Sequence, residues 1–182
     1  MKKTLLLLTY ILLISCTGKQ RSLQSTPTTR IDSTLKYFEE SKNADLALNA
    51  QYELTEKAFK LVSTIPSDTL LPKILYQKNW LHLSLGQYDS LIKYDKVLSR
   101  IPKQFQNELV LAKQNYLMGY YYEIIAEIPD SAFVRYNRSK TYYQREKDSS
   151  WIGKNLLNMA NIQQDQSDFF GSKETLTEAL QY

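Results

Sequence analysis

The sequence predicts an all-α fold, built as an α-solenoid of about four antiparallel helix pairs. Three observations lead to this prediction. The 182 residues include only 5 Gly and 5 Pro, while Leu, Lys, Gln, Glu and Ala are common, which favours helices over many short strands. No convincing run of alternating apolar and polar residues is present. One amphipathic pattern also recurs at intervals of 37 to 41 residues, which is typical of a repeat array.

The recurring pattern is clearest in residues 86–102, where a glycine, an aromatic residue and an amphipathic stretch precede a proline. Residues 129–143 and 168–180 repeat it, and an earlier copy precedes Pro66. In each copy, apolar or small residues recur at helical spacing, mostly at offsets of four and seven, which place them on one helix face. The first members of the copies, separated by 37, 41 and 40 residues, are Leu54, Leu91, Ala132 and Ser172.

Capping residues and prolines set the bounds of the first four expected helices. Asp32 or Ser33 can cap the first helix, and a stripe of apolar residues runs along the second. A proline ends the second helix, lies in the first turn of the third and follows the fourth. These helices are expected at residues 32–42, 46–65, 69–85 and 87–101.

The next four helices follow the same logic. Pro129 and Asp130 are expected to form the turn inside the third pair. The helices themselves are expected at residues 104–127, 131–146, 150–166 and 169–181. Together, the eight helices predict a domain over residues 32–182, with repeats at 32–66, 68–102, 104–147 and 150–182.

The last expected helix carries an apolar face that no further helix covers. Repeat arrays generally need a polar cap at their ends. We therefore expect either a truncated reading frame or an end that packs against itself or a partner. The residues concerned are Leu176, Ala179, Leu180 and Tyr182.

These helix pairs resemble tetratricopeptide (TPR) repeats over residues 32–182. The best matches are Gly86-Gln87-Tyr88 followed by Pro102, and the set Phe169, Ser172 and Ala179. The resemblance implies a right-handed solenoid whose first helices line a groove for protein or peptide partners. The sequence departs from the family where Leu91 replaces a small residue, where Ser167 replaces the turn glycine, and in its repeats, which are longer than about 34 residues.

The N-terminus has the form of a secretory signal. Two lysines precede an apolar run of roughly ten residues, which is too short to cross about 30 Å of hydrocarbon as a mature helix. Leu13-Ile14-Ser15-Cys16 resembles the lipobox of bacterial lipoproteins, which implies cleavage after residue 15 and lipidation of Cys16. An ordinary signal peptide or an uncleaved anchor is the open alternative.

Residues 16–31 then form a lipidated cysteine followed by a flexible tether. This stretch is rich in Ser, Thr and Gln and has almost no apolar residues, so it cannot offset its ordering entropy by burial. The expected location is the bacterial cell envelope, with the protein anchored to a membrane.

Composition argues against several function classes. The formal net charge is +4, and removing Lys2 and Lys3 with the signal segment leaves 4 − 2 = +2, which is too little to indicate nucleic-acid binding. His82 is the only histidine and is expected to pack in a helix or lie at the surface, so no imidazole pair can bind a metal. No phosphate-binding glycine motif is present. We expect no catalytic residues, no metal and no small-molecule cofactor.

A candidate binding face comes from aligning the first helices of the pairs. By the resemblance, these positions face the groove, and they suggest a lysine row with an aromatic floor suited to a peptide that bears carboxylates. The alternative is that the lysines belong to ordinary solvated helix faces and the tyrosines to packing. The aligned residues are Lys73, Tyr76, Trp80, Lys113, Tyr116, Tyr120, Lys154, Leu157 and Asn161, with Lys36 placed 37 residues before Lys73.

The function expected from the sequence is that of a non-enzymatic, membrane-tethered TPR lipoprotein that binds proteins or peptides in the envelope. The alternative is the truncated N-terminal sensory region of a longer protein, either a TPR-containing histidine kinase or a helix-turn-helix transcriptional regulator. Downstream coding sequence for more repeats and a membrane helix would distinguish the two.

Overall fold

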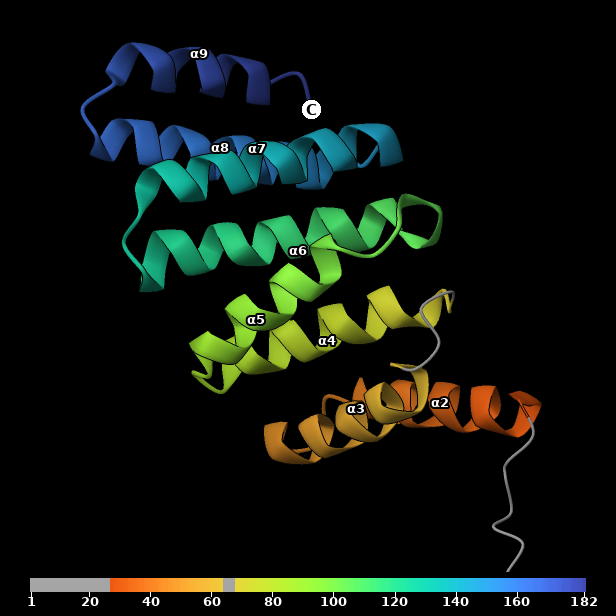
Figure 1. Ribbon diagram of the computed structural model, residues 1–182. Helices are drawn as coiled ribbons and strands as arrows, with labels where there is room; N and C mark the ends of the chain where they lie inside the picture. The colour runs from red at the N-terminus through yellow and green to blue at the C-terminus, as the bar shows by residue number, and fades with distance from the viewer. Residues whose placement is uncertain (1–26, 64–67) are drawn as a thin grey trace, which may run out of the picture.

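The computed structural model describes residues 27–63 and 68–182, and this part of the chain is all-helical. It contains eight α-helices, a 3-10 helix η1 and a π-helix η2, and no strand (Figure 1). The expected signal peptide, Cys16 and most of the tether lie outside the described residues, as do Ile65 and Pro66. The elements are α2 (Pro27–Ser41), α3 (Leu48–Val62), α4 (Leu70–Ser84), α5 (Tyr88–Ser99), η1 (Lys103–Phe105), α6 (Glu108–Tyr120), η2 (Tyr121–Ile125), α7 (Pro129–Glu146), α8 (Ser149–Asp165) and α9 (Phe169–Ala179).

Consecutive helices fold back on one another and stack along the molecule from α2 to α9 (Figure 1). The pairs α2–α3, α4–α5, α6–α7 and α8–α9 each pack internally. Neighbouring pairs are joined where α3 packs on α4 and where α7 packs on α8, and α4 also packs on α6. The first helices of the second and third pairs therefore lie next to each other.

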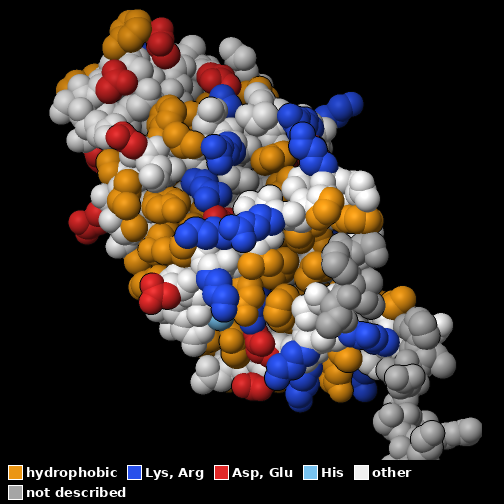
Figure 2. All heavy atoms as spheres, viewed as in Figure 1, with side chains coloured by type: hydrophobic (Ala, Val, Ile, Leu, Met, Phe, Trp, Pro, Cys, Tyr) orange, Lys and Arg blue, Asp and Glu red, His pale blue; other side chains and the backbone are white. Residues whose placement is uncertain are grey.

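Charged side chains are distributed unevenly over the surface. On the face drawn in Figure 2, Lys and Arg side chains follow one another over α7, α5 and α3, while Asp and Glu lie mostly toward the edge. Helix α7 alone has four basic residues and two acidic ones. This face is therefore more basic than the modest net charge of the chain suggests.

Two helix starts, those of α2 and α6, differ most from the expected bounds. Helix α2 begins at Pro27, so residues 27–31 are helical and are not part of a tether. Its first turn is tied to α3, because Arg30 Nε donates a hydrogen bond to the Leu61 carbonyl (2.7 Å). Helix α6 begins at Glu108 instead of residue 104, since the Asn107 side chain accepts a hydrogen bond from Val110 N (3.0 Å) and caps the helix.

Burial in the second helices reveals a regular repeat. The buried positions that begin each series are Gln51, Leu91, Ala132 and Ser172, which are 40, 41 and 40 residues apart. The expectation that Leu54 begins the first series was wrong, because Leu54 is only half-buried. An alignment by apolar residues misses Gln51, whose amide Nε2 can be buried because it donates to the Leu46 carbonyl (2.9 Å).

Burial in the first helices has the same period. Ile74, Gln114 and Asn155 are all buried, at steps of 40 and 41 residues. The extra residue in the second step is accommodated by η2, where Ala126 N donates to the Tyr121 carbonyl (2.9 Å). The expected α-helix over residues 104–127 was therefore wrong at its end, which is a π-helix.

The turns inside the last three pairs share one backbone conformation. Gly86, Glu127 and Ser167 have φ values of 69°, 54° and 62°, in the left-handed region. Each precedes the first buried residue of its second helix by five positions. Pro129 was expected in the third turn but instead begins α7, where a missing N–H and a fixed φ suit the first helical position.

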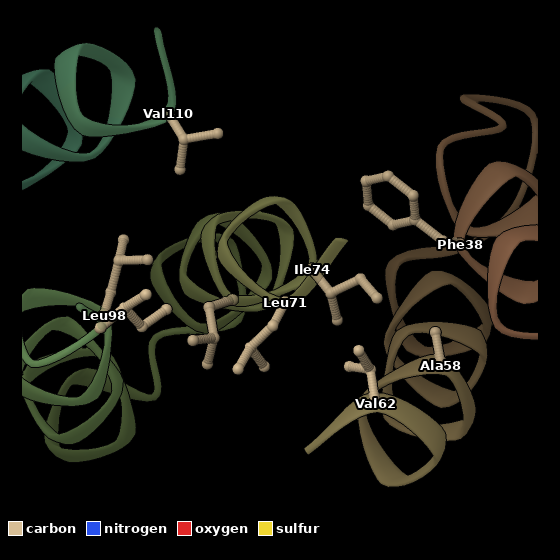
Figure 3. Close-up of a cluster of buried hydrophobic side chains, with 9 residues drawn as sticks. Phe38, Ala58, Val62, Leu71, Ile74, Leu98 and Val110 are labelled. Atoms are coloured by element: carbon tan, nitrogen blue, oxygen red, sulfur yellow. The ribbon is translucent and has the colours of Figure 1, made fainter. Parts of the chain in front are cut away.

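Buried apolar side chains from several helices meet around α4 (Figure 3). Full burial of one large apolar side chain contributes roughly 1.5–3 kcal/mol. Because five helices contribute to this cluster, neighbouring pairs stabilise one another. Its buried members are Phe38 of α2, Ala58 and Val62 of α3, Leu71, Ile74 and Leu75 of α4, Leu98 of α5, Ile101 just after α5, and Val110 of α6.

Aromatic residues of the repeat pattern are buried in some helix pairs and exposed in others. Tyr136 and Tyr143 are fully buried. Phe169 is 67% exposed, because no later described helix covers α9. Leu176 and Leu180 of the last segment are exposed for the same reason, although the Tyr182 hydroxyl accepts a hydrogen bond from Gln144 Nε2 on α7 (3.2 Å).

Candidate functional site

The nine aligned residues of the candidate face occupy corresponding places on α4, α6 and α8. They follow the steps of 40 and 41 residues that the buried residues follow. The alignment made from side-chain type therefore agrees with the alignment made from burial. The three sets are Lys73, Lys113 and Lys154; Tyr76, Tyr116 and Leu157; and Trp80, Tyr120 and Asn161.

None of the nine side chains is buried. On each helix, the second and third members lie three and seven residues after the lysine, so all three share one side of that helix. Trp80 is 36% exposed and Tyr120 is 43% exposed, which are high values for large aromatic side chains. We call this set of nine residues the α4–α6–α8 face.

Lys36 does not belong to the lysine row. With a step of 40 residues, Ser33 is the position in α2 that corresponds to Lys73, and Lys36 corresponds to Tyr76. The step of 37 residues used to include Lys36 rested on Leu54, and Leu54 does not begin the buried series of α3.

Tyr76 and Trp80 line a pocket of about 570 Å³ between α4, the start of α3 and the loop that follows α2. Lys42 lies at this pocket, and its ammonium group pairs with Glu39 of the same helix end. The pocket thus combines two aromatic walls with one partly exposed cation. The remaining lining residues are Ala44, Leu46, Ala47, Leu48, Gln51 and Gln77.

Tyr116 lies at the centre of an aromatic cluster. Its ring centroid is 4.9 Å from that of Trp151 in an edge-on arrangement and 5.4 Å from that of Tyr136. Its hydroxyl accepts a hydrogen bond from Asn158 Nδ2 (3.4 Å). Lys154 Nζ lies 4.5 Å from the centre of the Trp151 ring, so Trp151 connects α6 to the lysine of α8.

Trp151 was not among the expected site residues. It lies three positions before Lys154, on the same helix side, and that spacing was the available signal. Tyr143 stacks on it, with ring centroids 5.4 Å apart and planes at 9°. Burial, and then the neighbouring Tyr76, raises the pKa of the Tyr143 hydroxyl above its ordinary value, so this hydroxyl stays uncharged at physiological pH.

A polar cluster lies between α3 of the first pair and the second pair, α4 and α5. Lys78 of α4 is 1% exposed and forms an ion pair with Glu56 of α3. Its ammonium group is also 4.4 Å from the centre of the Tyr94 ring and 4.9 Å from that of Phe59. Burial, and secondarily the charge of Lys93, lowers the pKa of Lys78 to about 8. Sequence reasoning missed this cluster because Lys78 reads as a solvated helix residue.

His82 lies beside this cluster and packs as expected. Its ring stacks on Tyr94, with centroids 5.4 Å apart and planes at 7°. Its Nδ1 donates a hydrogen bond to Gln87 Oε1 (2.8 Å), and burial lowers its pKa. We find that this histidine is a packing residue between α4 and α5.

Across residues 27–63 and 68–182, we find no set of three His, Cys, Asp or Glu side chains placed to bind a metal ion. Within the same ranges, no helix combines the length and apolar character needed to cross a membrane. The arrangement of the α4–α6–α8 face suits contact with another molecule, through rigid aromatic rings and cationic side chains. Comparison of the sequence with protein-family models and with curated proteins finds no match.

Proposed function

We propose that this protein is a TPR-like lipoprotein of the bacterial cell envelope that binds a segment of a partner protein on its α4–α6–α8 face. In this proposal, the helix pairs form a right-handed solenoid, and Cys16 carries the lipid that anchors the chain to a membrane. The role is binding and not catalysis.

The observation that carries this proposal is the pocket at Tyr76 and Trp80. Both residues were selected from the sequence alone, and both line a pocket of about 570 Å³, within the range of ligand pockets. Aromatic side chains supply large contact area at low conformational cost, and the exposed Lys73 offers positive charge at one end of the face. The pocket therefore suits an apolar side chain from a segment that also bears carboxylates.

The lysine row extends this preference along the face. Lys73 and Lys154 are exposed and Lys113 is half-buried, one on each of the three helices. Charges of one sign along a binding surface steer a partner of the opposite sign and reject partners of the same sign. We expect the bound segment to be acidic.

The test begins with crosslinking in the native cell to identify the partner, followed by titration of the purified protein with the segment that was captured. Trp80→Ala should weaken binding by about 2 kcal/mol or more, which is the range of an aromatic hot spot. Val97→Ala is a matched control, because Val97 is 38% exposed but lies on α5. Equal affinity of both variants, with both still folded, would refute the proposal.

A further inference from the structure

A second pocket, of about 350 Å³, lies between the end of α5, helix α6 and helix α7. It is on the opposite side of α6 from the α4–α6–α8 face, because Leu111 of this pocket and Lys113 of that face are separated by about 200° of helix rotation. We call it the arginine pocket. Its lining residues are Ser99, Gln106, Leu111, Asn115, Arg135, Asn137, Arg138, Thr141, Tyr142 and Arg145.

Three arginines of α7 line this pocket. Arg138 and Arg145 follow Arg135 by three and ten residues, a spacing that keeps them along one side of the helix. No carboxylate side chain is among the lining residues. Figure 2 shows basic side chains over α5 and α7, two of the helices that line this pocket.

The three guanidinium groups are engaged to different extents. Arg135 is fixed in place, because its Nη2 donates to Asp95 Oδ2 (2.7 Å) and its Nη1 donates to Asn115 Oδ1 (3.4 Å). Arg145 Nη1 donates to both carboxylate oxygens of Glu108 (3.1 and 3.2 Å), and both partners are exposed. Arg138 makes no hydrogen bond or ion pair with any described residue. Among the three arginines of the pocket, it is the one with no partner in the described part of the chain.

We propose that the arginine pocket binds a small molecule that bears a carboxylate or phosphate group, with Arg138 as the main contact and Arg145 as the second. A guanidinium group presents paired N–H donors that match two oxygens of such an anion. Arg145 can join because an exposed ion pair such as Arg145–Glu108 contributes little to stability and exchanges readily for another anion. A volume of about 350 Å³ suits a small ligand.

This proposal does not depend on the proposed function, because the two sites lie on different sides of α6. Isothermal titration calorimetry of the purified full chain with citrate and with inorganic phosphate tests it, and the two anions distinguish carboxylate from phosphate chemistry. We expect saturable one-to-one binding of at least one of them. Arg138→Gln should weaken it about tenfold or more, and Arg138→Lys should give an intermediate affinity, since lysine keeps the charge but loses the paired donors.

The control is Lys60→Gln, which removes the same charge from an exposed residue of α3 outside the pocket. It should leave the affinity unchanged, and the circular dichroism spectra of all variants should match. Absence of binding by both anions would overturn the proposal. Weak binding that falls equally in Arg138→Gln and Lys60→Gln would also overturn it, because it would indicate general attraction to positive charge.

Discussion

One position in the helix stack differs sharply between the second repeat and the two that follow. Lys78, Met118 and Met159 are separated by the repeat steps of 40 and 41 residues, and all three are buried. In the third and fourth repeats, a methionine fills the place between helices. In the second, a lysine pairs with Glu56 and is surrounded by aromatic rings. The same backbone arrangement therefore accepts an apolar interior or a polar one, provided that the charge has a partner.

The neighbouring position shows the same contrast. Asn79, Gly119 and Ala160 correspond, and all are buried. Neither amide atom of Asn79 makes a hydrogen bond within the described residues. At these two positions the second repeat is thus more polar than the third and fourth, and both positions lie on the helix that carries Tyr76 and Trp80.

Removing only one partner of the buried ion pair should have the largest effect. Glu56→Ala leaves the Lys78 charge uncompensated, and we expect it to lower the free energy of unfolding by about 3 kcal/mol. Replacing both partners by apolar residues, Lys78→Met together with Glu56→Leu, should change stability by less than about 1 kcal/mol or increase it, because no unpaired charge is left. Urea denaturation measures both variants. If the double variant loses as much stability as Glu56→Ala, the polar and apolar interiors are not interchangeable.

Gly119 offers the next largest effect. A Cβ atom at this position would lie 2.6 Å from Cε1 of the fully buried Tyr136 ring, so Gly119→Ala should force apart α6 and α7 and cost about 1–3 kcal/mol. Gly153→Ala is the matched control in α8, where the new Cβ would meet nothing within 4 Å. It should stabilise the protein by about 0.5–1 kcal/mol. Thermal melts that show equal changes for both variants would contradict the close packing at Gly119.

The pH dependence of stability should distinguish the second repeat from the others. Because the pKa of Lys78 is about 8 in the folded state and 10.5 when unfolded, the unfolded chain binds more protons between these values. Stability should therefore increase as pH rises from about 8 to 10, by roughly 1–2 kcal/mol from this group. The comparison of wild type with Lys78→Met in urea at pH 8 and pH 10 isolates the effect. An identical pH dependence of stability in wild type and Lys78→Met would show that Lys78 does not cause it.

The smallest predicted effect concerns the turns. Ser167 and Glu127 adopt the left-handed conformation that Gly86 adopts in the second repeat. Ser167→Gly and Glu127→Gly should each stabilise the protein by about 0.5–1 kcal/mol, and Gly86→Ala should destabilise it by about 1 kcal/mol. Shifts in the denaturation midpoint with an unchanged slope would give these values. Loss of stability in both Ser167→Gly and Glu127→Gly would show that the native Ser167 and Glu127 side chains make stabilising contacts.

Much of the fold could be predicted from the sequence because local signals agreed with it. Prolines, capping residues and apolar stripes placed all eight helices of the described residues, most of them within a few positions of their ends. The nine residues of the α4–α6–α8 face were also aligned correctly from the sequence. Their side-chain pattern recurs at the nearly constant steps of 40 and 41 residues that the buried residues follow.

The errors have physical causes that local signals do not carry. Gln51 and Lys78 are polar residues at buried positions, and only their tertiary partners make that burial possible. The π-helix at residues 121–125 accommodates one extra residue, which a count of helical spacing cannot locate. Trp151 joins the face through contacts with α6 and α7, so its role depends on packing between pairs.

Site-specific photo-crosslinking tests the central claim most directly. A photoreactive amino acid placed at Trp80 or at Tyr120, on two different helices, should capture the same partner in the native cell, because both side chains belong to the α4–α6–α8 face. The same amino acid at Val97, which is similarly exposed but lies on α5, should not capture it. Capture at Val97 but not at Trp80 or Tyr120, or unrelated adducts at the two face positions, would contradict the account.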